Sequence, residues 1–328
     1  MIARLDPAPA DVPADPDERQ HLLDTSLASE TVGWWHEHDG RWQIRVEEFE
    51  AWEYFVDPGV RAAAATLDTN LTAATLRHWR RRIGRCHLSM NDAWTLPAWC
   101  ESLAGLQDDR PIVILHADDH DDLMPPRLRP ANEGWLDLFT NQPVALDVES
   151  TTAAIRSSAI GMGSFLVPLL HDQRVVELRH LRARPHRYPD AGWLARTTTP
   201  EPLVSSSWRI AVEPSDRPTD LRFRRLVDPA EWVADLQGAI VLVHIDLDYL
   251  ANRYDADSNW AEREDLFDPT DDEVTHLLDD LWSALDQIED QVIGTAIGIS
   301  PGFFPADHWP TALTSIEHRF RLHEVPDD

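Results

Sequence analysis

Two apolar runs, each followed at once by closely spaced acidic residues, constrain the fold of this chain most strongly. Residues 112–117 lead into the acidic stretch 118–122, and residues 240–245 lead into Asp246 and Asp248. Nearly continuous apolar runs of this length are typical of parallel strands that are buried on both faces. Since ligand sites in open α/β sheets lie at the carboxyl ends of such strands, we expect both motifs at one edge of a sheet.

The spacing within each motif predicts that its polar side chains converge. In an extended chain, residues i, i+2 and i+4 point to one face, so Asp118, His120 and Asp122 share a face, as do Asp246 and Asp248. Carboxylates with a single histidine suit Mn²⁺ or Mg²⁺ better than the nitrogen and sulfur sites typical of zinc. A pair of such ions activates a water molecule for attack on an electrophilic carbon, which indicates a metallohydrolase.

Other interpretations of the two motifs fit less well. An EF-hand loop requires glycine at its sixth position, where the motifs place Leu123 and Ala251. Phosphatases with an Asp-x-Asp nucleophile usually place a lysine near the phosphate, and this chain contains no lysine. Simple solvated turns would require five ligand-type residues to fall in register on two apolar strands by coincidence.

The charge of the chain restricts its partners. Its 328 residues carry 58 acidic side chains against 29 basic ones, all arginine, for a formal net charge of -29. Such acidity disfavours nucleic acid and anionic membranes and favours a cationic substrate such as an arginine-containing peptide, although a compositional bias explains it equally well.

Only Cys86 and Cys100 are present, so we expect no disulfide framework and a reducing compartment. Without a signal-peptide pattern or an apolar run of about 18 residues, a soluble, cytoplasmic protein is expected.

Strand and helix patterns alternate along the chain and predict an α/β fold with three layers. Residues 1–19 are rich in Pro, Asp and Ala and are expected to be disordered. An N-terminal extension is expected over 20–75 and a catalytic domain over 76–328. In the first half of the chain we expect aromatic-rich strands in 33–56 and helices over 71–83 and 93–106. A glycine loop is expected to enter a buried helix over 159–170, followed by a strand over 175–181 and long loops over 182–222. Towards the end we expect a helix after a capping box of Thr270 and Glu273, and a strand over 292–299.

The paired motifs resemble those of a known family. Asp-x-His-x-Asp on one strand and Asp-x-Asp on a later one is the pattern of the arginase/ureohydrolase fold. Residues 115–123, LHADDHDDL, are similar to the LHFDAHPDL segment of the peptide arginase family, and residues 245–249, IDLDY, to its IDLDYF. Softer similarities occur in the glycine-containing segment 160–170 and in the loop 299–303. The resemblance covers residues 85–305.

The resemblance implies a three-layer α/β/α arginase/deacetylase-like fold with a mostly parallel sheet and two Mn²⁺ ions, with Mg²⁺ or another divalent metal as a substitute. It further implies hydrolysis of an arginine side chain, within a ribosomally made precursor peptide, to ornithine and urea. By carry-over, Asp118 and Asp246 bridge both metals. Asp122 completes one ion, and His120 with Asp248 the other.

One ligand departs from the family pattern. The resemblance places a further histidine ligand in an Asn-His pair before the first motif, where this chain has Asn91 followed by Asp92. Three alternatives remain: Asp92 ligates a hard cation itself, His87 supplies the ligand, or the first metal site is weakened.

On the substrate side, a guanidinium requires a carboxylate partner, for which Glu317, Asp255 and Asp307 are candidates. His308, just after the loop 300–305, is the candidate proton shuttle for the leaving amine. Ser300, Gly302 and Asn91 are expected to bind substrate. His116 and His244 lie inside apolar strands and are expected to be core histidines.

Two rival functions remain at this level. One is a hydrolase of a free guanidino compound or an amide on the same fold; the other is a metal-poor pseudoenzyme that only binds a peptide. The N-terminal extension is expected to bind the leader part of the substrate or to cover the sheet edge. A homo-oligomer is compatible with the resemblance.

Overall fold

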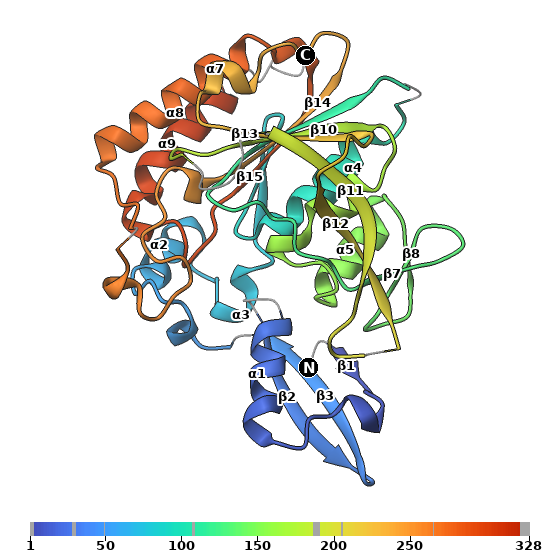
Figure 1. The fold of residues 1–328 in the computed structure, drawn as a ribbon. Helices are drawn as coiled ribbons and strands as arrows, with labels where there is room; N and C mark the ends of the chain where they lie inside the picture. Colours follow the sequence, from blue (N-terminus) through green and yellow to red (C-terminus); the bar gives the residue numbers. More distant parts are fainter. Residues whose placement is uncertain are drawn as a thin grey trace.

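A mixed nine-stranded sheet organises the described part of the chain (Figure 1). The computed structural model describes residues 3–27, 31–48, 50–106, 109–185, 191–204, 206–264 and 266–321. The strand order is β12 (Trp208–Ser215), β11 (Ala191–Pro200), β13 (Leu221–Leu226), β10 (Val175–Leu181), β6 (Ile112–Ala117), β14 (Ile240–Asp246), β15 (Val292–Gly298), β5 (Cys86–Ser89) and β4 (Arg80–Ile83). The strands from β13 across to β5 are parallel to their neighbours, and the outer strands are antiparallel.

Helices pack on both faces of this sheet, because the central strands are apolar on both sides. Val113 and Leu115 of β6 belong to one core cluster, together with residues of α2 (Val60–Leu67), α7 (Pro229–Trp232), α8 (Asp271–Asp286) and α9 (Trp309–Arg321). Ile112 and Ile114 belong to a second cluster, with α4 (Thr95–Leu103), α5 (Val148–Arg156) and α6 (Leu166–Leu170). Figure 1 shows α7, α8 and α9 on one side of the sheet and α4 and α5 on the other. The α/β class is confirmed, and the arrangement is compatible with three α/β/α layers.

Several of the elements expected over residues 76–328 are present at or close to their expected positions. Strand β10 spans the expected range, and β15 ends one residue earlier. The short helix η4 (Met162–Ser164) and α6 follow the glycine segment. The side chain of Thr270 accepts from the backbone N–H of Glu273, and the side chain of Glu273 reaches back to Thr270, which confirms the capping box of α8.

The expectation of long loops over residues 182–222 is wrong for most of the described part. Strands β11 and β12 form an antiparallel pair that runs from Trp193 and Ser215 to Pro200 and Trp208. Pro200 ends β11 and Pro214 lies on the outermost strand β12, positions where a missing N–H is tolerated. Buried Leu194, Ile210 and Val212 supply the apolar face that the proline and arginine content of this segment concealed.

The single helix expected over residues 71–83 is also wrong. A four-residue helix, α3 (Ala73–Leu76), begins at the Thr72 cap, and β4 follows. Residues 80–83 pair antiparallel with β5 at the edge of the sheet. Tertiary pairing therefore overrides the local helical periodicity.

The N-terminal part forms a small unit of its own at one end of the molecule (Figure 1). Strands β1 (Ala3–Leu5), β3 (Arg41–Glu48) and β2 (Thr31–His38) form an antiparallel sheet beside α1 (Pro16–Ser26). Strands β2 and β3 confirm the first part of the expected aromatic-rich strands in 33–56, but the later part is wrong, since Trp52–Tyr54 form the short 3-10 helix η2. The structure describes β1 and the start of α1 within residues 1–19, where the composition favoured disorder; buried Leu5, Leu23 and Ile44 explain this difference.

Three short strands, β7 (Leu128–Pro130), β8 (Trp135–Asp137) and β9 (Pro143–Val144), form a further small sheet between β6 and α5 in the sequence. None of the described helices is long and apolar enough to cross a membrane.

Candidate metal centre

The two acidic motifs lie side by side at the carboxyl ends of neighbouring parallel strands. Strands β6 and β14 pair in register, with His116 opposite His244 and Ala117 opposite Ile245. Asp118 directly follows β6, and Asp246 is the last residue of β14. The chain turns after each strand instead of continuing the alternation, since Asp248 lies in the short helix η5 (Leu247–Tyr249) and Asp122 has a φ of 50°.

Short hydrogen bonds connect the motif residues to one another. The Nδ1 atom of His120 lies 2.7 Å from Oδ2 of Asp248. The backbone N–H of His120 donates to Oδ1 of Asp118 at 2.5 Å, and that of Asp248 donates to Oδ1 of Asp246 at 2.9 Å. The backbone N–H of Asp119 donates to the other oxygen of Asp248. Backbone donors thus fix the carboxylates before any ligand binds.

Asp92 joins this cluster from a third strand end, that of β5. It lies at the start of the short helix η3 (Asp92–Trp94) after β5, and Ser300 Oγ lies 2.6 Å from its Oδ2 and 2.7 Å from Oδ2 of Asp246. Gly298 permits this approach, because a Cβ atom there would lie 1.5 Å from Oδ1 of Asp92. His87, the alternative ligand, instead lies 3.6 Å from Glu101. Of the two positions, the structure therefore brings Asp92 to the cluster.

The cluster opens into a cavity of about 650 Å³. Most of the expected metal ligands line it, namely Asp92, His120, Asp122, Asp246 and Asp248, whereas Asp118 lies fully buried beneath them. The rest of the lining includes the glycine segment Gly161 to Ser164, Phe303, and residues 24–27 at the end of α1. Both the resembling glycine segment and the N-terminal unit therefore contribute to the same cavity.

The buried carboxylates hold their protons unusually tightly in the absence of a cation. Burial, followed by the charge of Asp248, raises the pKa of Asp118 and of Asp246 well above the ordinary value. Burial and the charge of Asp92 do the same to the pKa of Asp122. His120 has a pKa well above its usual range: burial lowers it, but Asp248 and the bonds to Asp118 and Asp255 outweigh that effect. A bound cation would supply the positive charge that this cluster lacks.

One oxygen of the cluster makes no hydrogen bond and lies 3.4 Å from Nε2 of the buried His116. Oδ2 of Asp118 is buried and makes no hydrogen bond, which is rare for an interior carboxylate. Ligand atoms of Asp118, His120 and Asp248 lie within 4.8 Å of one another, as do those of His116, Asp118 and His244. The buried oxygen without a hydrogen bond and the oxygen-rich donor set fit a divalent cation, and the two groups share Asp118.

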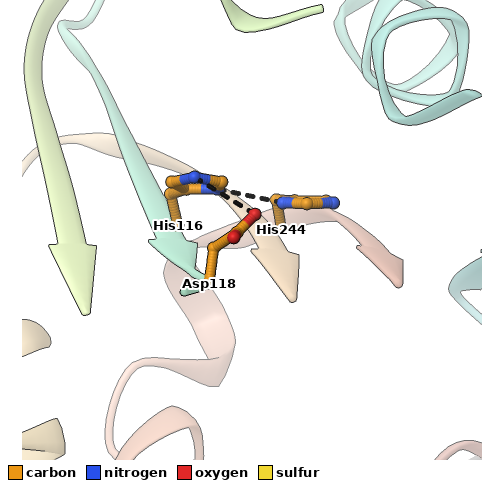
Figure 2. Close-up of side chains that lie close together, drawn as sticks. All are labelled: His116, Asp118 and His244. Atoms are coloured by element: carbon orange, nitrogen blue, oxygen red, sulfur yellow. Dashed lines mark hydrogen bonds and ion pairs between the residues drawn. The ribbon is translucent and has the colours of Figure 1, made fainter. Parts of the chain in front are cut away.

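A row of buried histidines runs beneath the cluster, one from each of three adjacent strands. His180 of β10 lies opposite His116, which lies opposite His244. Figure 2 shows the rings of His116 and His244 edge to edge with the Asp118 carboxylate beside them; the two Nδ1 atoms are 3.0 Å apart. Burial, with the charges of His244 and His180, holds the pKa of His116 well below its ordinary value.

The hydrogen bonds of this row fix where its protons lie. His116 Nε2 donates to the carbonyl of His120 at 3.1 Å, so a neutral His116 accepts at Nδ1 from His244. His244 then faces Asp92 through Nε2, at 3.2 Å. Both histidines are core residues, as expected, but their contacts with the cluster were missed. The sequence signal that could have revealed these contacts is that His116 and His244 each lie two residues before an aspartate of the cluster, Asp118 and Asp246.

Three residues expected to act on substrate line neither cavity and contact other elements. His308 Nδ1 lies 2.7 Å from Asp271 of α8, and Glu317 on α9 forms an ion pair with Arg81 of β4. Asp307 pairs with Arg253 at 3.0 Å. Nothing in the sequence distinguishes a loop or helix residue that faces the cavity from one that faces a neighbouring element.

The remaining expected residues lie at or next to the cluster. Ser300 bonds within it, and Asp255 contacts His120. Asn91 and Gly302 line a smaller cavity of about 130 Å³, which shares Met162 and Phe303 with the larger one.

Searches against protein-family models and against curated proteins find no match for this chain. The likeness to the peptide arginase family therefore depends on the motifs alone, and the chemistry of the site is inferred from its own side chains.

Proposed function

We propose that this protein is a binuclear metal-dependent hydrolase that converts arginine side chains in a ribosomally synthesised peptide to ornithine, with release of urea. The main support is the convergence of most of the expected ligands on one cavity, next to the buried Asp118, whose Oδ2 makes no hydrogen bond. The mostly parallel sheet with helices on both faces supports an arginase/deacetylase-like fold as part of this proposal.

Each ligand has a proposed place. Asp118 and Asp246 would serve both cations, His120 and Asp248 would hold one, and Asp92 and Asp122 would hold the other. Oxygen-rich sites of this kind favour Mn²⁺ or Mg²⁺. When bound, the pair lowers the pKa of a shared water molecule, so that a nucleophile for the guanidinium carbon exists at neutral pH.

The protein's own contribution is to hold the carboxylates in position and to admit the substrate. The backbone N–H groups of Asp119, His120 and Asp248 and the hydroxyl of Ser300 fix the ligand oxygens in advance. The cavity of about 650 Å³ is within the range that holds a drug-sized ligand, so a peptide segment around the arginine fits as well as the side chain. Its acidic lining favours a cationic side chain.

The test combines metal content with product analysis. The purified protein is loaded with Mn²⁺, bound metal is quantified, and an arginine-containing peptide is followed for urea and for a mass loss of about 42 Da, the CN₂H₂ removed when metal-activated water converts a guanidine to an amine. We expect two metal ions and this mass loss. The Asp246→Asn variant should abolish the mass loss, whereas Asp290→Asn, at an exposed position, should retain it.

Two metals without this product would exclude the peptide arginase activity and leave the metal centre. Fewer than two would favour a peptide-binding pseudoenzyme.

A second candidate, hydrolysis of a free guanidino compound, is supported by two arginines in the cavity wall. Arg127 and Arg209 line the same cavity as the acidic cluster, and both lie near Glu201, at 3.7 and 3.5 Å. Two arginines against one glutamate leave a positive charge suited to the carboxylate of a free amino acid. Urea release from free arginine, but not from the peptide, would favour this candidate.

A further inference from the structure

The imidazole ring of His120 is held at both of its nitrogen atoms. Its Nδ1 faces Asp248 at 2.7 Å, and its Nε2 lies 2.8 Å from Oδ1 of Asp255. The ring of Phe303 packs edge-on against it, with the ring centres 5.3 Å apart. With Nδ1 directed at the carboxylate cluster, Nε2 is the atom that orients the ring.

Asp255 is itself fixed on every side. Arg263 lies 2.9 Å from its Oδ2, and the side-chain amide of Asn252 donates to its Oδ1 at 3.2 Å. The backbone N–H of Asp255 donates to the Asn252 side chain at 2.9 Å.

The backbone around Asp255 supports the same interpretation. Asp255 and Ala256 both have a φ of 51°, a left-handed conformation that is uncommon for residues other than glycine. The backbone N–H of Ala256 donates to the carbonyl of Gly302 at 3.0 Å, next to Phe303. Such conformations persist where the surroundings enforce them, and they gather at functional sites.

These contacts argue against the role in substrate binding expected from the sequence. A carboxylate that binds a guanidinium in a bidentate manner needs both oxygens directed at the substrate. In Asp255, Oδ1 faces His120 and Asn252, and Oδ2 faces Arg263. Asp255 is also absent from the residues that line the cavity of about 650 Å³.

We propose that Asp255 is a positioning residue for the metal ligand His120: its Oδ1 accepts a hydrogen bond from Nε2–H of His120, which would direct Nδ1 at the metal. Histidine ligands commonly donate their second N–H to a carboxylate, which fixes the tautomer and increases the basicity of the ligating nitrogen. Arg263 and Asn252 hold Asp255 in turn. This inference rests on the proposed metal centre and adds a residue outside the resembling motifs.

The test measures Mn²⁺ affinity, which requires no substrate. Asp255→Asn is the informative variant, because asparagine tolerates a positive φ and keeps the size of the side chain while removing its charge. We expect Mn²⁺ binding, measured by calorimetry, to weaken by about 10- to 100-fold at one of two sites. The matched control is Asp257→Asn in the same loop, where the carboxylate accepts from the backbone of Asn259; its affinity should not change.

A double variant separates positioning from a general structural role. If Asp255 acts through His120, adding Asp255→Asn to His120→Ala should change Mn²⁺ affinity by no more than about twofold. Additive losses, or unchanged affinity in Asp255→Asn, would overturn the inference even if the wild-type protein binds two metals and releases urea. A wild-type protein that binds no Mn²⁺ would overturn the proposed centre as well. A raised KM with unchanged Mn²⁺ affinity in the Asp255→Asn variant would indicate that Asp255 binds substrate instead of positioning His120.

Discussion

At the scale of single residues, the candidate centre depends on how closely Asp92 can approach the ends of β14 and β15. The sequence places an aspartate where the resembling family has a histidine, and its side chain is shorter. Gly298, opposite Asp246 in the sheet, leaves the space that Asp92 Oδ1 fills. Gly298 therefore allows Asp92 to belong to the candidate ligand set, because it has no side chain that would exclude the carboxylate.

Replacing this glycine should displace Asp92. A Cβ atom at Gly298 would lie 1.5 Å from Asp92 Oδ1, so Gly298→Ala must move the carboxylate. We expect Mn²⁺ affinity to fall at least about tenfold at one site. Gly192→Ala is the control, because an added Cβ there meets nothing within 4 Å. Equal Mn²⁺ affinity in the two variants would exclude Asp92 from the site.

The buried carboxylates also predict how the metal-free protein responds to pH. The pKa of Asp122 is raised by burial and by the charge of Asp92, so the folded state binds the proton more tightly than the unfolded state. The stability that this proton contributes is present below the unfolded pKa, near 4, and is lost as the pH rises through the raised folded pKa.

Asp122→Asn removes this titration, so the melting temperature of the metal-free variant should increasingly exceed that of the wild type from pH 4 to pH 8. Thermal melts with a chelator measure this difference. Saturating Mn²⁺ should reverse its sign at pH 8, because only the wild type then gains the full metal contribution. A difference that does not vary with pH would contradict the raised pKa.

At the scale of elements, α8 shows where local signals were sufficient. The apolar stripe with Val274, Leu278 and Leu281 is buried, and the cap begins where the sequence predicts it. By contrast, residues 191–226 are rich in the polar residues and prolines that are common in loops. They became strands because β13 could extend the parallel sheet beside β10 and β11 could pair with β13.

The cap of α8 should affect stability without affecting the metal centre. Thr270→Ala removes the acceptor for the N–H of Glu273, and we expect a loss of about 1 kcal/mol in the free energy of unfolding. Mn²⁺ affinity should stay unchanged, since α8 contributes no residue to the cavity. Urea denaturation and calorimetry measure the two quantities separately. A parallel loss of metal binding would mean that the centre responds to any loss of stability.

At the scale of the whole molecule, the net charge of -29 influences which substrates approach the cavity. An acidic surface attracts cationic ligands and accelerates their association, and salt screens this attraction over about 10 Å at 0.1 M. The arginine-containing peptide of the proposed reaction is such a ligand.

We therefore expect kcat/KM for a basic peptide to fall about tenfold between about 0.05 and 0.5 M salt, with kcat nearly constant. Saturating Mn²⁺ keeps metal loss out of the comparison. A peptide whose single arginine is flanked by acidic residues is the control, and its kcat/KM should rise or stay level with salt. The same salt response for both peptides would mean that the net charge of the chain does not attract the substrate and reflects a compositional bias alone.

The sequence by itself determined the α/β class, the two central strands, and most of the ligand set, because each depends on local order. Runs of apolar residues specify buried strands, and the residues directly after two parallel neighbours must meet at one sheet edge. The approach of Asp92, the histidine row, the Ser300 bridge and the Asp255 contact were decided only by the tertiary structure. They join residues more than 50 positions apart, which no local pattern encodes, and they depend on which strands became neighbours. For the same reason, His308 and Glu317, which looked suitable by type, face α8 and β4.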